Sequence, residues 1–229
     1  MAKPFEIIPG IYCVGGSDIS HPHDALVYLI KGPESAILID AGAGRASDVI
    51  WKNIQSFGVG AQDLSCLILT HAHVDHIGGA QYFKDNTGCR IVAHLYDQEA
   101  IESGDPLRTA ASWYGVRLPK LQIDRLLTEK SESLPLAENQ LICLHTPGHT
   151  PGSLSPYIDW KGQRVLFGQD IHGPFSVDFG SNLSDWKSSM EELLELKADI
   201  LCEGHFGIYR PSDKVQGYIK RYLEEYSPD

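Results

Sequence analysis

The chain has 229 residues, a formal net charge of −11 at pH 7 and a sequence pI near 5.3. An acidic balance without a basic stripe argues against a nucleic-acid partner, and no apolar stretch is long enough for a membrane-spanning helix. Hydrophobic residues make up 42% of the chain and no Ser/Gly-rich linker divides it. We therefore expect a single domain over residues 1–229.

The first half of the chain predicts strands followed by a helix and another strand. Apolar runs predict strands at residues 5–8, 11–14, 25–30 and 35–39. A helix is expected at residues 46–57, because Val49, Ile50 and Ile54 recur on one face and Gly58 ends the pattern. The run at 64–69 predicts a further strand.

The second half repeats this theme. Strands are predicted at residues 141–144, 154–158, 164–167 and 200–202, and helices at 186–196 and 214–226. Residues 95–134 mix polar helix-like stretches with aromatic residues, and we interpret them as an inserted element. The alternative is a surface excursion with buried aromatic side chains.

The most informative segment follows the run at 64–69 and contains three histidines and an aspartate within six positions. Its sequence is Thr70-His71-Ala72-His73-Val74-Asp75-His76-Ile77-Gly78-Gly79. Imidazole and carboxylate groups are the usual ligands of zinc and of non-haem iron. A merely polar loop is the alternative, but such a set after a buried strand has no packing purpose.

The spacing indicates how the ligands are presented. His71 and His73 lie at i and i+2, on one side of an extended chain, so both can reach one ion. Asp75 and His76 can serve a second ion. A helical site would use i and i+4, so we expect a strand end and loop, with Gly78 and Gly79 permitting a tight entry into a following helix.

The pattern His71-x-His73-x-Asp75-His76 resembles the signature of the metallo-β-lactamase superfamily, and matching residues follow at the ends of apolar runs downstream. These are His149 in Thr-Pro-Gly-His, Asp170 in Phe-Gly-Gln-Asp, and His205 in Glu-Gly-His. The resemblance implies an α/β fold, the αββα sandwich of two packed mixed sheets flanked by helices. It also implies that His71, His73 and His149 bind one metal, that Asp75, His76 and His205 bind the other, and that Asp170 bridges them.

The implied bridge has a simple physical reason. Two divalent ions about 3.5–4 Å apart need a shared anion to offset their repulsion. We expect two divalent metals, with zinc as the first choice and iron or manganese as alternatives, and a bridging hydroxide as the nucleophile. Asp75 is the expected acid/base residue, because its carboxylate can hold a metal and a proton donor at once. The positive charges of two such metals would outweigh the negative charges of Asp75, Asp170 and the hydroxide, so we expect an anionic small molecule as substrate. The resemblance also implies that the insertion at residues 95–134 borders the substrate cleft.

Within the superfamily, the ligand set narrows the expected reaction. β-Lactamases usually carry Cys or Ser where Asp170 stands, and flavodiiron proteins usually carry Glu where His73 stands. The pattern is similar to glyoxalase II, lactonases and related hydrolases, so we expect cleavage of an ester, thioester or lactone. Only 24 residues follow His205, which argues against the glutathione-binding domain of glyoxalase II. The alternative is a mononuclear iron enzyme resembling persulfide dioxygenases.

Three further residues are candidates for roles beside the metals. Asp40 ends an apolar strand and either caps a helix or, as the resemblance implies, orients a metal ligand by hydrogen bonding. His172 and Tyr209 are candidates for contact with the substrate or a proton. His21 and His23 are interpreted as residues of a solvated loop.

The chain contains five scattered cysteines without a Cys-x-x-Cys spacing. They predict buried reduced thiols rather than a disulfide framework or a zinc ribbon. The start Met1-Ala2-Lys3-Pro4 shows no apolar signal region, so we expect a cytoplasmic protein. The expected partner is a small molecule, with no membrane partner, and the sequence leaves the oligomeric state open.

Overall fold

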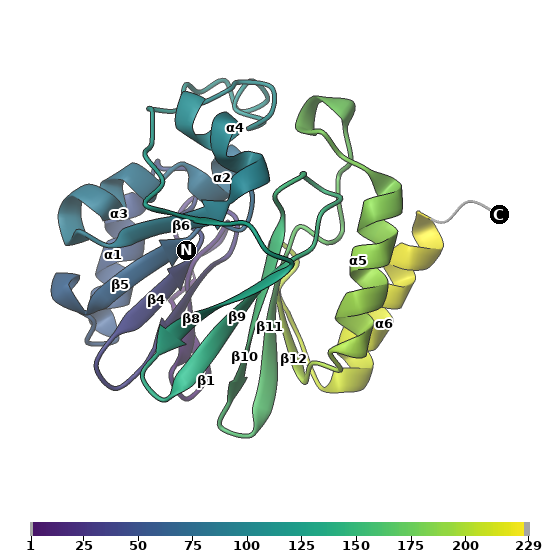
Figure 1. Ribbon diagram of the computed structural model, residues 1–229. Helices are drawn as coiled ribbons and strands as arrows, with labels where there is room; N and C mark the ends of the chain where they lie inside the picture. Colours follow the sequence, from purple (N-terminus) through teal and green to yellow (C-terminus); the bar gives the residue numbers. More distant parts are fainter. Residues whose placement is uncertain (1, 227–229) are drawn as a thin grey trace. The chain divides into compact units, whose positions relative to one another are not determined.

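The computed structural model describes residues 2–226 of the chain. They form two compact units, residues 2–128 and 129–226, each built on one β-sheet (Figure 1). The single domain expected from the sequence stays a prediction. In both units the candidate ligands follow the ends of strands, so the sheets determine where these side chains lie.

The sheet of the first unit, within its described residues, has seven strands that neighbour one another in chain order. They are β1 (Phe5–Ile8), β2 (Ile11–Gly15), β3 (Val27–Lys31), β4 (Ala36–Ile39), β5 (Leu64–Ile68), β6 (Arg90–His94) and β7 (Arg125–Leu127). Strands β1 to β4 pair antiparallel, whereas β4 to β7 pair parallel. The carboxyl ends of β4, β5 and β6 therefore share one edge, and the metal-ligand segment begins there.

The helices of the first unit are α1 (Ser47–Ser56), α2 (Val74–Ile77), α3 (Ala80–Thr87) and α4 (Gln98–Ser103), with short 3-10 turns η1 (Ala61–Asp63) and η2 (Leu95–Asp97). Helices α1 and α3 contact each other and lie on one face of the sheet (Figure 1). They bury Ile50, Ile54 and Phe83 in the apolar cluster of this unit. Because these side chains are closely packed against the sheet, the strand ends that carry the candidate ligands are held rigidly.

The sheet of the second unit, as far as the structure describes it, has six strands in the spatial order β13-β12-β11-β10-β9-β8. They are β8 (Ser131–Leu136), β9 (Asn139–His145), β10 (Leu154–Trp160), β11 (Gln163–Gln169), β12 (Ile200–Glu203) and β13 (Ile208–Tyr209). Strand β10 runs antiparallel to β9 and β11, and β12 runs parallel to β11. Hence β9, β11 and β12 all end at one edge.

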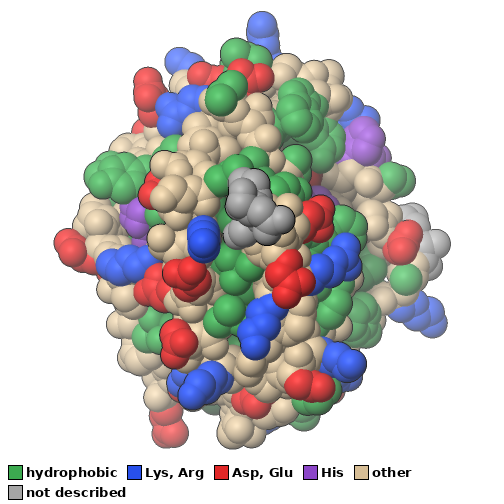
Figure 2. All heavy atoms as spheres, turned by 90° about the vertical axis from the view of Figure 1, so that its right-hand side faces the viewer, with side chains coloured by type: hydrophobic (Ala, Val, Ile, Leu, Met, Phe, Trp, Pro, Cys, Tyr) green, Lys and Arg blue, Asp and Glu red, His purple; other side chains and the backbone are tan. Residues whose placement is uncertain are grey.

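The helices of the second unit are α5 (Leu183–Glu195) and α6 (Ser212–Glu225), preceded by the 3-10 turn η3 (Val177–Phe179). Asn182 caps α5 by accepting the backbone N–H groups of Ser184 and Asp185. The two helices pack together, and their buried side chains include Trp186 and Ile219. On the face shown in Figure 2, Lys and Arg are interspersed with Asp and Glu.

The predicted elements agree with the structure at most positions. The predicted strand at 5–8 has the same bounds as β1, and the other predicted strands and helices overlap observed ones within a few residues. The sequence analysis missed β6, β7, β8 and β13. Strand β7 lies inside the segment interpreted as an insertion, and β8 begins inside it, so the final part of that segment contributes to an edge strand of each sheet.

All five cysteines are buried and lie outside any disulfide, as predicted. Burial raises the pKa of Cys13 to about 12 and that of Cys66 to about 11. Both thiols therefore stay protonated and behave as small apolar side chains. Within residues 2–226, no helix combines the length and the hydrophobicity that a membrane span requires.

Candidate metal centre

In the first unit, the predicted ligand segment begins directly after β5 and is buried. His71 and His76 have no exposed surface, and His73 and Asp75 are each 4% exposed. One nitrogen of His71 and one of His73 lie within 4.8 Å of each other, as do one ligand atom each of Asp75 and His76. The structure thus presents two neighbouring pairs of potential ligands in this unit.

The local backbone explains this pairing. His73 has an extended conformation, whereas Asp75 and His76 lie on the single turn of α2. Sequence analysis expected a loop here, but the backbone N–H of Gly78 donates to the carbonyl of Val74 and closes a short helix. A Cβ at Gly79 would overlap the carbonyl oxygen of Ala41, so the predicted tight entry into α3 requires glycine.

Asp40 follows β4 and connects that strand to the ligand segment. Its Oδ1 accepts the backbone N–H of Thr70 at 2.9 Å, and its Oδ2 accepts the Thr70 hydroxyl at 2.8 Å. The same Oδ2 lies 2.7 Å from Nδ1 of His76. Because a carboxylate accepts the proton on Nδ1, the lone pair of His76 is on Nε2, the atom then able to bind a metal.

Two further aspartates were missed by the sequence analysis; one holds this segment, and the other holds the loop after β4. Asp97 is buried, and its Oδ2 accepts the backbone N–H of Ala72 at 2.9 Å. Asp24 is also buried, and its Oδ1 accepts the N–H of Ala43 at 2.8 Å. Burial raises the pKa of Asp24, although hydrogen bonds from Ser20 and Ala43 oppose this. Since Asp97 follows β6, its only sequence signal is its place after an apolar run.

In the second unit, the three predicted ligands follow three strand ends on one edge of the sheet. His149 lies in the loop after β9, Asp170 directly follows β11, and His205 comes after β12. Oδ2 of Asp170 lies 3.2 Å from Nε2 of His205 and 3.7 Å from Nε2 of His149. One carboxylate oxygen is therefore flanked by two imidazole nitrogens.

The peptide of Gly204 makes room for this arrangement. A Cβ at Gly204 would overlap Oδ1 of Asp170, so any larger residue would displace the carboxylate. The N–H of Gly204 also donates to the carbonyl of Gln169, which joins the ends of β11 and β12. Glycine is required here because the carboxylate of Asp170 lies so close, and not because of the backbone conformation, since the φ angle of Gly204 is not positive.

Glu203 is a further residue that sequence analysis did not single out. It is fully buried at the end of β12, and its Oε1 lies 2.6 Å from Nδ1 of His172. Its Oε2 accepts the backbone N–H groups of His205 and Phe206 at 2.6 and 2.7 Å. The sequence did offer a signal for Glu203, because it follows the apolar run at residues 200–202 as Asp40 follows the apolar run at 36–39.

Tyr209 and the remaining histidines have identifiable contacts. The hydroxyl of Tyr209 donates to the carbonyl of Phe206 at 3.2 Å, and its ring packs on Tyr218. His21 and His23 are half-buried, and the ring of His23 meets the edge of Tyr114. The predicted substrate or proton contacts of His172 and Tyr209 stay predictions.

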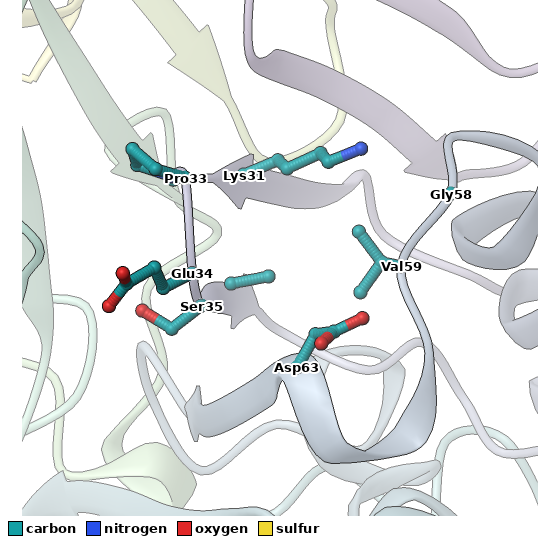
Figure 3. A pocket seen from close by; sticks show the side chains of 9 residues that line it. Lys31, Pro33, Glu34, Ser35, Gly58, Val59 and Asp63 are labelled. Carbon is teal, nitrogen blue, oxygen red and sulfur yellow. The ribbon is translucent and has the colours of Figure 1, made fainter.

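The cavity in Figure 3 lies away from the candidate ligands of the first unit. It has a volume of about 230 Å³ and is bordered by the turn between β3 and β4 and by the segment after α1. Lys31 donates to the carbonyl of Phe57, and Asp63 accepts the N–H of Gly60. Because this cavity is at the amino ends of β4 and β5, it does not border the ligand segment of this unit.

The donor set fits divalent metal ions. Each unit groups buried imidazole and carboxylate atoms at distances that a shared ion can span, and Asp40 fixes the tautomer of one imidazole. Such nitrogen and oxygen donors suit zinc, iron and manganese. Grouped carboxylates and imidazoles without thiolates favour a hydrolytic or oxygen-activating site over a structural zinc site.

Comparison with known sequences supports this interpretation. A family model described as the metallo-beta-lactamase superfamily matches residues 22–205. The acyl-coenzyme A thioesterase MBLAC2 of Gallus gallus is 27% identical over 228 residues, which cover 87% of this chain and 79% of that protein. The hydroxyacylglutathione hydrolase GloC of Haemophilus influenzae is 31% identical over 185 residues, covering 77% of this chain and 82% of that protein.

Comparison with solved structures concerns the fold alone. A variant of a metallo-beta-lactamase from Cronobacter sakazakii with a HARLDQ motif has a TM-score of 0.84 and 21% sequence identity. The match covers 99% of this chain and 96% of that one. It confirms the fold class predicted from the sequence.

Proposed function

Because this chain belongs to the metallo-β-lactamase superfamily, we propose that its two groups of ligand side chains together hold two divalent metals. In this proposal His71, His73 and His149 hold one metal, and Asp75, His76 and His205 hold the other. Asp170 is shared between them. The observation that carries the proposal is the position of Oδ2 of Asp170, flanked by Nε2 of His149 and Nε2 of His205.

The predicted enzyme class, a metal-dependent hydrolase of this superfamily, is confirmed by the family match and by relatives that are named as hydrolases. We propose that the bond cleaved is an ester, thioester or lactone bond of a small molecule. Two relatives are named for thioester substrates, an acyl-coenzyme A and a hydroxyacylglutathione. A thioester is therefore the substrate class to test first, and glutathione thioesters belong in that test.

The chain's own residues have distinct parts in the proposed reaction. When bound, the metals would polarise the substrate carbonyl and make a water molecule acidic. Asp75 accepts the proton of the attacking water and returns it to the leaving group. Asp40 keeps His76 in one tautomer and one orientation. Its hydrogen bonds to Thr70, together with the hydrogen bond of Asp97 to Ala72, hold the backbone that carries His71 and His73.

Zinc is the metal that we propose, and the cytoplasm is the proposed location. Zinc suits a hydrolase with several imidazole ligands and no redox step. Five buried thiols without a disulfide support a reducing compartment. The net positive charge proposed for the site favours substrates with an anionic group, such as thioesters of acidic carriers.

Metal content and turnover together test the proposal. The protein is purified without added metal, in air and under anaerobic conditions, and its metals are quantified by elemental analysis. About two metal equivalents per chain, together with hydrolysis of one member of a thioester, ester and lactone panel, are expected. About one iron per chain, with oxygen uptake when a thiol persulfide is added, would instead support the mononuclear dioxygenase.

A further inference from the structure

Glu203 is a fully buried carboxylate whose two oxygens serve three different groups. Oε1 contacts Nδ1 of His172 at 2.6 Å, and Oε2 accepts the backbone N–H groups of His205 and Phe206 at 2.6 and 2.7 Å. Burying a carboxylate is costly unless its oxygens are hydrogen-bonded. These contacts satisfy that requirement at the point where β12 ends.

The contacts of Glu203 fix the turn that carries His205. The N–H of Glu203 itself donates to the carbonyl of Gly207, so the turn is closed by its own backbone as well as by this side chain. The neighbouring N–H of Gly204 donates to Gln169, which directly precedes Asp170. The positions of His205 and Asp170 are therefore connected through residues 203 and 204.

His172 extends the same arrangement to a second imidazole. Its side chain is 12% exposed, and its ring lies edge-on to His205 with centroids 5.5 Å apart. Phe206 also packs against His172, with a centroid distance of 4.6 Å. Because Glu203 accepts the proton on Nδ1 of His172, this ring has a fixed orientation beside His205.

We propose that Glu203 is a positioning residue that orients His205 and His172 together and thereby determines how tightly the metal at Asp75, His76 and His205 is held. In this proposal Glu203 acts through these two histidines and is not itself a ligand. This inference rests on the proposed function, because it takes His205 as a metal ligand. Outer hydrogen-bond partners of this kind typically change metal affinity by about 10- to 100-fold when they are replaced.

The first experiment compares metal affinity in full-length variants. Glu203→Gln keeps one oxygen acceptor but removes the carboxylate, Glu203→Ala removes every contact, and Asp199→Asn is the matched control. Asp199 also lies beside β12 and accepts a backbone N–H, that of Arg164 at 2.8 Å, but at the opposite end of the strand. Zn²⁺ dissociation constants are measured by chelator competition.

The expected result is selective. Glu203→Gln weakens one of two metal equivalents by about 10- to 100-fold, Glu203→Ala weakens it further, and Asp199→Asn leaves both unchanged. Wild-type affinity in both Glu203 variants, or equal loss in Asp199→Asn, would overturn the inference while leaving the dinuclear site intact. A wild-type chain that binds fewer than two metals would overturn the dinuclear site and this inference with it.

A metal-free measurement covers the case in which Glu203→Ala does not fold. Amide hydrogen exchange of the wild-type apoprotein should protect the N–H groups of His205 and Phe206, since both donate to a buried carboxylate. In Glu203→Gln this protection should fall at both amides, with no change at Arg164. Unprotected amides at His205 and Phe206 in the wild type would overturn the inference.

Discussion

Oδ2 of Asp40 lies 2.7 Å from Nδ1 of His76, although 36 positions separate the two residues in the chain. Both side chains are almost fully buried, with 4% of the Asp40 side chain and none of the His76 side chain exposed. Asp40 adopts a left-handed backbone conformation with φ of 61°, which brings its carboxylate back over Thr70 and His76. Strand β4 thus orients a side chain that belongs to the ligand segment after β5.

Replacing Asp40 by Asn should weaken the metal held by His76. Asn tolerates the left-handed backbone and keeps one oxygen that can accept from Thr70. Its amide nitrogen, however, cannot accept the hydrogen bond from His76 as the second carboxylate oxygen does. We expect the affinity for one metal equivalent to fall by about 10- to 100-fold. Chelator competition measures this, with Asp63→Asn as a control that removes a carboxylate from the cavity in Figure 3. Unchanged affinity in Asp40→Asn would exclude an orienting role.

Replacing Asp170 by Asn or Ala should abolish the shared ligand. Oδ2 of Asp170 is the atom between Nε2 of His149 and Nε2 of His205. We expect loss of at least one metal equivalent and a fall in kcat/KM of about 100-fold or more, because the charge stabilisation by a metal is worth several kcal/mol. Elemental analysis and steady-state kinetics check both effects. Retained turnover with two bound metals would disprove the bridge.

The predictions from sequence succeeded for elements that a local run of apolar residues specifies. Apolar runs predicted β4, β5, β11 and β12 because strands that are buried on both faces are continuously apolar. The residues after β5, β11 and β12 include every proposed ligand except His149, which follows β9. Parallel pairing then places the carboxyl ends of neighbouring strands together.

The missed elements lack this local signal. Strand β8 has the sequence SESLPL, in which only Leu134 and Leu136 are buried. It lies at the edge of its sheet, where a proline such as Pro135 can be accommodated. Strand β7 has only three residues, too few for a period of two to be recognised. The run at 91–93 in β6 did carry a signal that the sequence analysis overlooked.

The supporting acids could not be assigned because their partners are distant in sequence. Asp97 accepts the N–H of Ala72, 25 residues earlier, and His172 contacts Glu203, 31 residues later. Hydrophobic periodicity does not specify which backbone amide a carboxylate meets. Such contacts follow only once the pairing of strands and the course of the loops are known.

A pair of glycine substitutions should separate close approach at the site from ordinary backbone effects. A Cβ at Gly204 would overlap Oδ1 of Asp170, whereas one at Gly217 in α6 would meet nothing within 4 Å. Gly204→Ala should lower the free energy of unfolding by about 1–3 kcal/mol through overpacking and should also reduce metal content. Gly217→Ala should raise it by about 0.5–1 kcal/mol, because alanine favours a helix interior.

Urea unfolding of the two metal-free variants measures the free energies, and elemental analysis of the loaded proteins measures metal content. Opposite signs of the two changes are the expected result. If Gly204→Ala were as stable as wild type and kept its full metal content, the close approach to Asp170 would not constrain this position.

The pH dependence of stability should include a contribution from His145. Burial lowers the pKa of this imidazole from 6.5, although a hydrogen bond with the Pro151 carbonyl partly opposes the shift. The folded state therefore favours the neutral ring, and the unfolded state binds more protons as the pH falls. This contribution to stability is fully present above pH 6.5 and is lost progressively as the pH falls below 6.5.

His145→Gln keeps a donor for the Pro151 carbonyl but cannot titrate, so it isolates this effect. Free energies of unfolding from urea titrations at several pH values between about 5 and 8 are compared for the two proteins, both free of metal. The wild type should lose more stability than His145→Gln as the pH falls, since only its unfolded state gains a proton at this position. Parallel pH profiles for the two proteins would show that the pKa of His145 is the same in the folded and unfolded states.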